Sequence, residues 1–205
     1  MVSDPSSSPS VPNVSESAPE GTPDGQGQPA DPRFPIGEHD FRVAVTQAAI
    51  DDAREAIRRL PEDLAAALEG LDSEQLDTPY RDGGWTVRQV VHHLADSHLN
   101  SHCRFRLALT EDVPEIRPYD EKLWAELDDA RSGPLEPSLA ILEGVHRRWS
   151  ALLDSLEPAD YDQRLFHPEI GEELSLAQMT VGYGWHGRHH IAHITTLRQQ
   201  KGWNG

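Results

Sequence analysis

The sequence predicts an all-α fold in which four principal helices form a bundle. Apolar residues recur at three- and four-residue spacing in four long segments, the pattern of helices that bury one face. Two of these segments begin with a capping box, TVRQ at residues 86–89 and SLAQ at residues 175–178. No segment shows the sustained two-residue alternation of a half-buried strand. Four helices with longish connections favour a four-helix bundle.

The chain divides into a tail and one domain. Residues 1–33 are rich in Ser, Pro, Gly and acidic residues and nearly lack large apolar side chains. Such a segment cannot bury enough apolar surface to offset its ordering entropy, so we expect it to be disordered. Residues 34–205 are expected to form the folded domain, a length that suits one compact unit.

The first helical region has apolar residues at helical spacing over residues 43–60 and again over residues 62–71. Between them, Pro61 is expected to break the helix or to begin a new first turn, because its ring lacks an N–H. A loop, DTPYRDGGW, comes next. The capping box at Thr86 then opens a long helix that is expected to reach about Leu109.

The second half begins with a loop rich in Pro and acidic residues, which is expected to hold a short helix near residues 120–129. Pro137 and Ser138 begin a third long helix that is expected to end near Leu156. The stretch HPEIGEE predicts a small turn or hairpin. The capping box at Ser175 opens a last helix to about Lys201.

Composition excludes several classes of function. The chain has 205 residues and a formal net charge of −17, and Lys122 and Lys201 are its only lysines. So negative a surface repels nucleic acid and anionic membranes. The single cysteine allows no intrachain disulfide and favours a reducing compartment. With neither an apolar run of about 18 residues nor a signal-peptide pattern, a cytoplasmic protein is expected.

The stretch WHGRHHIAHI, residues 185–194, indicates a metal site. In a helix, His186, His190 and His193 share one face, and two imidazoles at i and i+4 can bind one ion. A zinc-protease motif HExxH is absent, because residues 187 and 188 are Gly and Arg. An HxxxH pair alone is a weak signal, and a buried row of satisfied histidines is the competing interpretation.

A third ligand is expected from HHLADSH on the second long helix. His98 falls on the core stripe and His93 lies at its flank, whereas His92 and His102 look more exposed. Periodicity leaves the choice open. Three neutral nitrogen ligands would leave coordination positions for water or substrate, as in catalytic sites. Such ligands suit Zn²⁺, the expected ion, with Ni²⁺ as the alternative.

Several neighbouring residues are candidates for supporting roles. Asp96, one turn after a candidate ligand, is a candidate general base or hydrogen-bond acceptor, or else a solvated carboxylate. Arg104 and Arg188 could anchor an anionic substrate, although surface ion pairs are favoured for both. Trp85 and Trp185 flank the histidine motifs, and core packing is the expected role of both.

Five stretches together resemble the YfiT-like branch of the DinB superfamily: FPIGEHDF, DTPYRDGGWTVRQVVHHLADSHLNS, RPYDEKLW, HRRWSALL and WHxxHHIAHI. They cover about residues 34–203. The resemblance implies a four-helix bundle with one divalent metal held by three histidines. Matched to the family's motifs, these ligands are His93, His186 and His190. His189 and His193 then become neighbours of the site.

The resemblance also implies activities. Members are labelled metal-dependent hydrolases, and the best-understood branch resembles S-transferases that join a low-molecular-weight thiol such as bacillithiol to an electrophile. We therefore expect a metal-dependent S-transferase acting on a small thiol and an electrophile. A hydrolase that uses metal-bound hydroxide is the alternative, and a non-catalytic metal-binding stress protein is the third reading. The resemblance implies a homodimer, whereas the expectation of no nucleic-acid partner and no membrane contact comes from the acidic composition.

Overall fold

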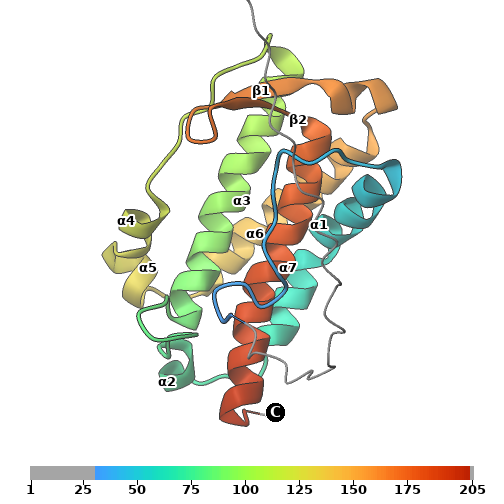
Figure 1. The fold of residues 1–205 in the computed structure, drawn as a ribbon. Coiled ribbons are helices and arrows are strands. Elements are labelled where there is room, and N and C mark those ends of the chain that lie inside the picture. The colour runs from blue at the N-terminus through green and yellow to red at the C-terminus, as the bar shows by residue number, and fades with distance from the viewer. Residues whose placement is uncertain (1–30, 204–205) are drawn as a thin grey trace, which may run out of the picture.

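A computed structural model describes residues 31–203 of the protein, so all but the last three residues of the tail predicted to be disordered, residues 1–33, lie outside the described part. Figure 1 shows four long helices arranged as a bundle: α1 (Gln47–Leu68), α3 (Val87–Thr110), α6 (Glu136–Asp154) and α7 (Leu176–Lys201). The prediction of an all-α bundle is confirmed. The shorter elements are α2 (Ser73–Leu76), α4 (Glu121–Ala125), α5 (Asp128–Ser132), the 3₁₀ turn η1 (Pro158–Asp162), β1 (Arg164–His167) and β2 (Glu172–Ser175).

Both predicted capping boxes begin the helices that carry the histidines. The Gln89 backbone N–H donates to the Thr86 hydroxyl over 3.1 Å, and the Gln89 side chain accepts from the Thr86 N–H over 3.0 Å. Ser175 and Gln178 repeat this arrangement at the start of α7. Each pair satisfies backbone N–H groups that the first turn of a helix leaves without partners. The two helices therefore begin where the sequence predicts.

The predicted break at Pro61 is wrong, because Pro61 lies inside the continuous helix α1. The buried residues of α1 continue at helical spacing across the proline, from Ile57 and Leu60 to Leu64. A proline in a helix removes one backbone bond, but burial of the same face on both sides can hold the helix together. The carbonyl that Pro61 leaves without a helical partner belongs to Ile57.

The stretch HPEIGEE forms the turn of a β-hairpin in which β1 and β2 pair antiparallel. Leu165 pairs with Leu174, and both side chains are buried against the bundle. Gly171 has a φ of 74°, which suits glycine in the turn. Of the two forms expected here, the structure therefore has the hairpin. Four-residue strands are too short for a clear alternation of apolar residues, which explains why the sequence showed none.

The apolar core consists of two clusters separated by a layer of histidines. One cluster lies toward the hairpin and contains Phe105, Trp149 and Leu153. The other lies toward the opposite end and contains Leu94 and Leu142, among others. The helix segments between the two clusters carry His98 on α3, His146 on α6, and His186 and His190 on α7. The middle of the bundle is therefore polar, although it is buried.

Helix α3 is covered on several sides, because it packs against α6, α7, α4, α5 and β1. His92 and His102 are consequently 9% and 4% exposed, so the expectation that they lie near the surface is wrong. The stripe of large apolar residues marks only the face toward the bundle centre. The flanks are covered by short helices and a strand that periodicity on α3 could not reveal.

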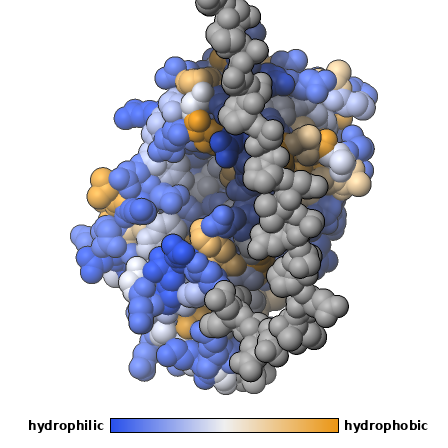
Figure 2. All heavy atoms as spheres, in the orientation of Figure 1, coloured by the Kyte–Doolittle hydropathy of each residue, from blue (hydrophilic) through white to orange (hydrophobic). Residues whose placement is uncertain are grey.

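The segment before α1 runs along α7 in the opposite direction. Arg33 contacts His193 through its carbonyl, Phe41 packs beside Gly182, and Gln178 reaches the Val43 carbonyl. Figure 1 shows this segment in blue, crossing in front of α7. On the face of the molecule drawn in Figure 2, most of the coloured residues are hydrophilic, with small apolar patches among them. Within residues 31–203, no helix has the length and apolar character needed to cross a membrane.

Candidate metal centre

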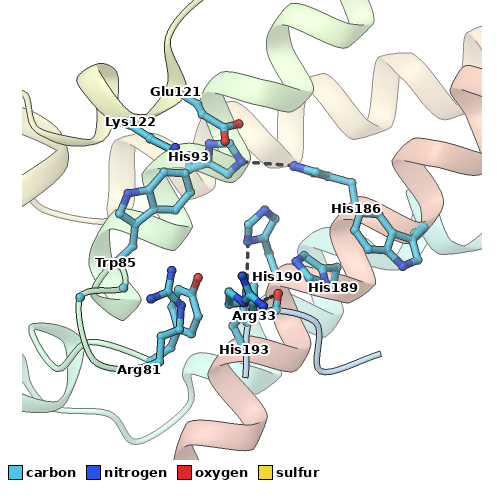
Figure 3. A pocket seen from close by; sticks show the side chains of 14 residues that line it. Arg33, Arg81, Trp85, His93, Glu121, Lys122, His186, His189, His190 and His193 are labelled. Carbon is cyan, nitrogen blue, oxygen red and sulfur yellow. Dashed lines mark hydrogen bonds between the residues drawn. The ribbon is translucent and has the colours of Figure 1, made fainter. Parts of the chain in front are cut away.

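Three histidine rings converge in the polar layer of the bundle. His93 extends from α3, and His186 and His190 extend from α7 one helical turn apart. One nitrogen from each ring lies within 4.8 Å of the other two, and the Nε2 atoms of His93 and His186 are 3.2 Å apart. Figure 3 shows the three rings directed toward a common point. The structure thus brings together the three residues that the family resemblance implied.

This arrangement fits a divalent metal ion. Ligand nitrogens at 2.0–2.1 Å from a tetrahedral zinc are about 3.3 Å from each other, close to the spacing of His93 and His186. Three nitrogen donors are the set used by catalytic zinc sites, which keep a position open for water or substrate. Nitrogen donors alone do not distinguish Zn²⁺ from Ni²⁺.

Burial keeps the three rings neutral, the form that binds metal. Burial lowers the pKa of His93 to about 4, with a smaller effect from His189 and His193. Burial also lowers the pKa values of His186 and His190 well below the usual value, and neighbouring histidines add to this. A neutral ring offers a lone pair at neutral pH without first losing a proton. The site is therefore ready for a cation.

The open side of the three histidines faces a pocket of about 340 Å³. Its aromatic walls include Tyr80, which stacks on His193 at 4.0 Å between ring centroids, and Trp85, 4.7 Å from His93. Charged residues complete the lining: Arg33, Arg81, Glu121 and Lys122. The pocket can therefore hold an organic molecule next to the ion.

The three-histidine pocket agrees with comparisons to known proteins. Residues 56–194 match the DinB superfamily, which is more than half of the chain. This chain belongs to the DinB superfamily. Two Bacillus proteins named "Putative metal-dependent hydrolase", from B. mycoides and B. cereus, are 52% and 51% identical to it over 173 residues, covering 84% of this chain and 99% of each relative.

A solved structure gives the same result for the fold of this DinB protein. YfiT from Bacillus subtilis, described as a probable metal-dependent hydrolase with an unusual four-helix bundle topology, is 47% identical and superposes with a TM-score of 0.81. The likeness covers 84% of this chain and 99% of YfiT. Membership of the YfiT-like branch of DinB proteins, predicted from five stretches of sequence, is confirmed.

Asp96 of this DinB protein does not join the three histidines. It lines a separate cavity of about 230 Å³ together with His92, Asp129 and Ser138. Burial raises the pKa of Asp96 to about 6, and Asp129 adds to the effect. The side chain follows His93 by three residues, but it leaves α3 toward α4 and α5. The structure therefore gives no contact through which Asp96 would serve as a base at the metal centre.

The structure shows what the two arginines and two tryptophans with expected supporting roles contact. Arg188 forms an ion pair with Asp52, with 2.9 Å between Nη2 and Oδ1, as expected. Arg104 donates to the Arg117 carbonyl and lies outside the pocket. Trp85 and Trp185 both line the pocket and are partly buried. Trp85 also packs against the second apolar cluster, as expected, whereas Trp185 stacks on His189 and belongs to neither cluster. Both tryptophans flank the ligands in space as well as in sequence.

Two further residues, Glu121 and His146, have places near the metal centre that were not predicted from the sequence. Glu121 lines the pocket, and loss of hydration raises the pKa of its carboxyl, with Lys122 opposing and Glu169 and Asp120 adding to the shift. Only the fold brings this first residue of α4 into the pocket that the ligands line. His146 is different, because it lies on the helical stripe between Leu142 and Trp149. That spacing was a usable signal for a buried histidine facing the centre of the DinB bundle.

Proposed function

We propose that this protein is a metal-dependent hydrolase whose ion is held by His93, His186 and His190. The observation that carries the proposal is the convergence of three imidazoles, two of them buried and that of His186 partly buried, at an open pocket of about 340 Å³. The names of the Bacillus relatives support the same class of reaction. Zn²⁺ is the ion that we expect, with Ni²⁺ as the alternative, because both accept three nitrogen ligands.

His93, His186 and His190 would hold a divalent ion, which would supply activation of water for hydrolysis at neutral pH. Glu121 is the pocket residue that we assign to proton transfer, because it is the carboxyl in the pocket lining and loss of hydration raises its pKa above the usual value. Trp85 and Tyr80 provide flat apolar walls that orient the organic part of a substrate.

The pocket also favours an anionic group on the substrate. Arg81 and Lys122 both line it, and within residues 31–203 neither forms an ion pair. Two cations at one pocket are notable in a chain with a net charge of −17. Without these two cations, the negative potential of the acidic surface would repel an anionic substrate.

The S-transferase activity predicted from the resemblance is the second candidate, and the comparisons favour hydrolysis over it. The presence of Arg81 and Lys122 in the pocket supports this second candidate, because the two cations would bind a carboxylate-bearing thiol as well as an anionic ester. In that reaction the thiol sulfur would bond to the electrophilic carbon, and the leaving group would depart with the thiol proton.

The experiment is an assay of the Zn²⁺-loaded protein with chromogenic esters and amides and with a chromogenic electrophile, each with and without a panel of small thiols. Thiol-independent, metal-dependent release of product supports hydrolysis. Conjugation that requires a thiol supports S-transfer and overturns hydrolysis. No turnover on any combination, despite bound metal, supports the non-catalytic metal-binding protein.

A matched pair of variants tests the role of Glu121. Glu121→Gln is expected to lower kcat by about 10²-fold, because general acid–base groups contribute at least that much. Glu143→Gln, on the exposed face of α6, removes the same charge outside the pocket and should leave kcat unchanged. Equal activity of both variants would remove Glu121 from the proposed mechanism.

A further inference from the structure

The proline in α1 leaves one backbone carbonyl in the bundle core without its helical hydrogen bond. In an α-helix, the carbonyl of residue 57 would accept the N–H of residue 61. Residue 61 is Pro and has no N–H, so the helix leaves the Ile57 carbonyl without that partner. Nδ1 of His146, a ring that is 1% exposed, contacts this oxygen instead. The missing helix bond is therefore replaced by a bond to α6.

From His146, two further hydrogen bonds lead to the metal centre. Nε2 of His146 lies 3.0 Å from Nδ1 of His98, and Nε2 of His98 lies 3.1 Å from Nδ1 of His186. His98 is fully buried. His146 is 1% exposed, and among the described residues the hydrogen-bond partners of both rings are other imidazoles and a carbonyl, with no carboxylate to balance a charge, so burial favours the neutral form of each. Three neutral rings thus link the Ile57 carbonyl to one ligand.

Each neutral ring carries one proton, so the donor and acceptor at every hydrogen bond of this series are fixed. A carbonyl only accepts, so His146 carries its one proton on Nδ1 and must accept at Nε2. His98 therefore donates from Nδ1 and accepts at Nε2. His186 then donates from Nδ1, which leaves the lone pair of its Nε2 free. That Nε2 is the atom 3.2 Å from Nε2 of His93.

The second ligand on α7 has a shorter chain of the same kind. Nε2 of His193 lies 3.2 Å from the Arg33 carbonyl, and its Nδ1 lies 3.4 Å from Nδ1 of His190. His193 must donate to the carbonyl, so it accepts from His190. The lone pair of Nε2 of His190 is again left free. His193, which the sequence analysis could not assign, orients a ligand ring.

We propose that His98 and His146 are positioning residues for the metal ligand His186. The Ile57 carbonyl, which has no helical partner because of Pro61, fixes the proton positions on both rings through the hydrogen bonds described above. These bonds place the proton of His186 on Nδ1 and leave Nε2 free to bind the metal. The inference rests on the metal site of the proposed function and adds the residues that prepare it. Histidine ligands are commonly oriented by a carboxylate or a carbonyl at the other ring nitrogen. Here two neutral imidazoles extend the reach of a distant carbonyl and add no negative charge beside the ion.

The test compares Zn²⁺ affinity, measured by competition with a chromogenic chelator, in the full chain and three variants. His98→Leu leaves Nδ1 of His186 without its acceptor, and a loss of about 10- to 100-fold is expected. His98→Gln should recover most of the affinity, because its amide both donates to His146 and accepts from His186. His102→Leu changes another buried histidine of α3, one that takes no part in these hydrogen bonds, and this variant should bind Zn²⁺ like the unmodified protein.

A second measurement needs no variant. Nitrogen-15 NMR of the histidine rings in the metal-free protein reports which nitrogen carries the proton. We expect the Nδ1–H form for His146, His98, His186 and His190, and the Nε2–H form for His193. An Nε2–H form at His98 or His186 would overturn the proposal, as would unchanged affinity in a folded His98→Leu variant.

These results separate the inference from the proposed function. If the unmodified protein binds no divalent ion, the proposed function fails, while the ring tautomers still test the chain. If the unmodified protein binds Zn²⁺ and His98→Leu binds it equally well, only the positioning chain fails.

Discussion

Adjacent histidines on α7 have different surroundings, and these decide which of them can bind metal. His190 is directed toward His93 and His186, with ring centroids 4.7 and 4.5 Å away. His189 turns to the other side of the helix face and stacks on Trp185 at 4.4 Å. One residue step rotates a side chain by about 100° around a helix, which explains the separation.

At the residue scale, we predict that His190→Ala loses the bound metal, because two remaining imidazoles hold an ion poorly. His189→Ala is the matched control and should keep it, since that ring lies outside the converging set. Elemental analysis of the purified proteins gives the metal content. Full occupancy in His190→Ala would contradict the assignment of the ligands.

Sequence periodicity placed His98 and His93 on or near the buried face of α3 but could not choose between them as ligands. Both are buried, and they differ in what their rings meet. His93 faces His186 directly, whereas His98 stands behind His186 and bonds to it through the other nitrogen. Which nitrogen of His186 each ring meets depends on the rotation of α3 and its crossing angle with α7, and the apolar pattern of one helix contains neither.

At the scale of elements, the close approach of α1 and α7 positions two of the three ligands. A Cβ atom added at Gly184 would lie 2.8 Å from both Cα and Cβ of Ala53 on α1. A Cβ at Gly187 would meet Leu60. Glycine at these positions lets the helix backbones come together and brings His186, which lies between them, to the polar layer. The glycine that removes the HExxH motif from the sequence therefore has a packing role.

We predict that Gly184→Ala destabilises the fold by about 1–3 kcal/mol, because backbone atoms of α1 would have to move. Gly144→Ala on α6 is the control, since its Cβ would meet nothing within 4 Å. That change should stabilise the protein by up to about 1 kcal/mol through better helix propensity. Urea unfolding of both variants measures the difference, and a stabilised Gly184→Ala would refute the close approach.

Across the whole molecule, burying several neutral histidines makes stability depend on pH. Burial lowers the pKa of His146 from 6.5 to about 4, with a hydrogen bond to Ile57 opposing and His102 assisting the shift. Between these values the unfolded chain holds one proton more than the folded chain at this residue. The free energy of unfolding therefore falls as the pH falls through this window.

We predict that the metal-free protein loses stability between pH 7 and pH 5, and that His146→Gln loses less. The histidine contributes a slope of about 1.4 kcal/mol per pH unit below its unfolded pKa, which glutamine lacks. Asp96, whose raised pKa works in the opposite direction, is common to both proteins and cancels in the comparison. Chemical denaturation at several pH values measures the slopes, and identical slopes would show that His146 is not buried neutral.

Assembly is a further property at this scale. The homodimer implied by the family resemblance stays a prediction. Leu123 and Leu127, at 66% and 56% exposed, are the most exposed large apolar side chains of the described residues. They lie at α4 and the start of α5, beside the cavity that contains Asp96 rather than at the mouth of the metal pocket.

By itself, the sequence determined the helices and the chemistry that they carry. Capping boxes at Thr86 and Ser175 and apolar residues at helical spacing are local signals, because a helix closes its bonds within four residues. Only the tertiary structure decided which histidines meet, why Pro61 lies inside a helix, and that Glu121 rather than Asp96 lines the pocket. Those outcomes depend on contacts between residues far apart in the sequence, such as His93 and His186, which are 93 positions apart, and local patterns do not record such contacts.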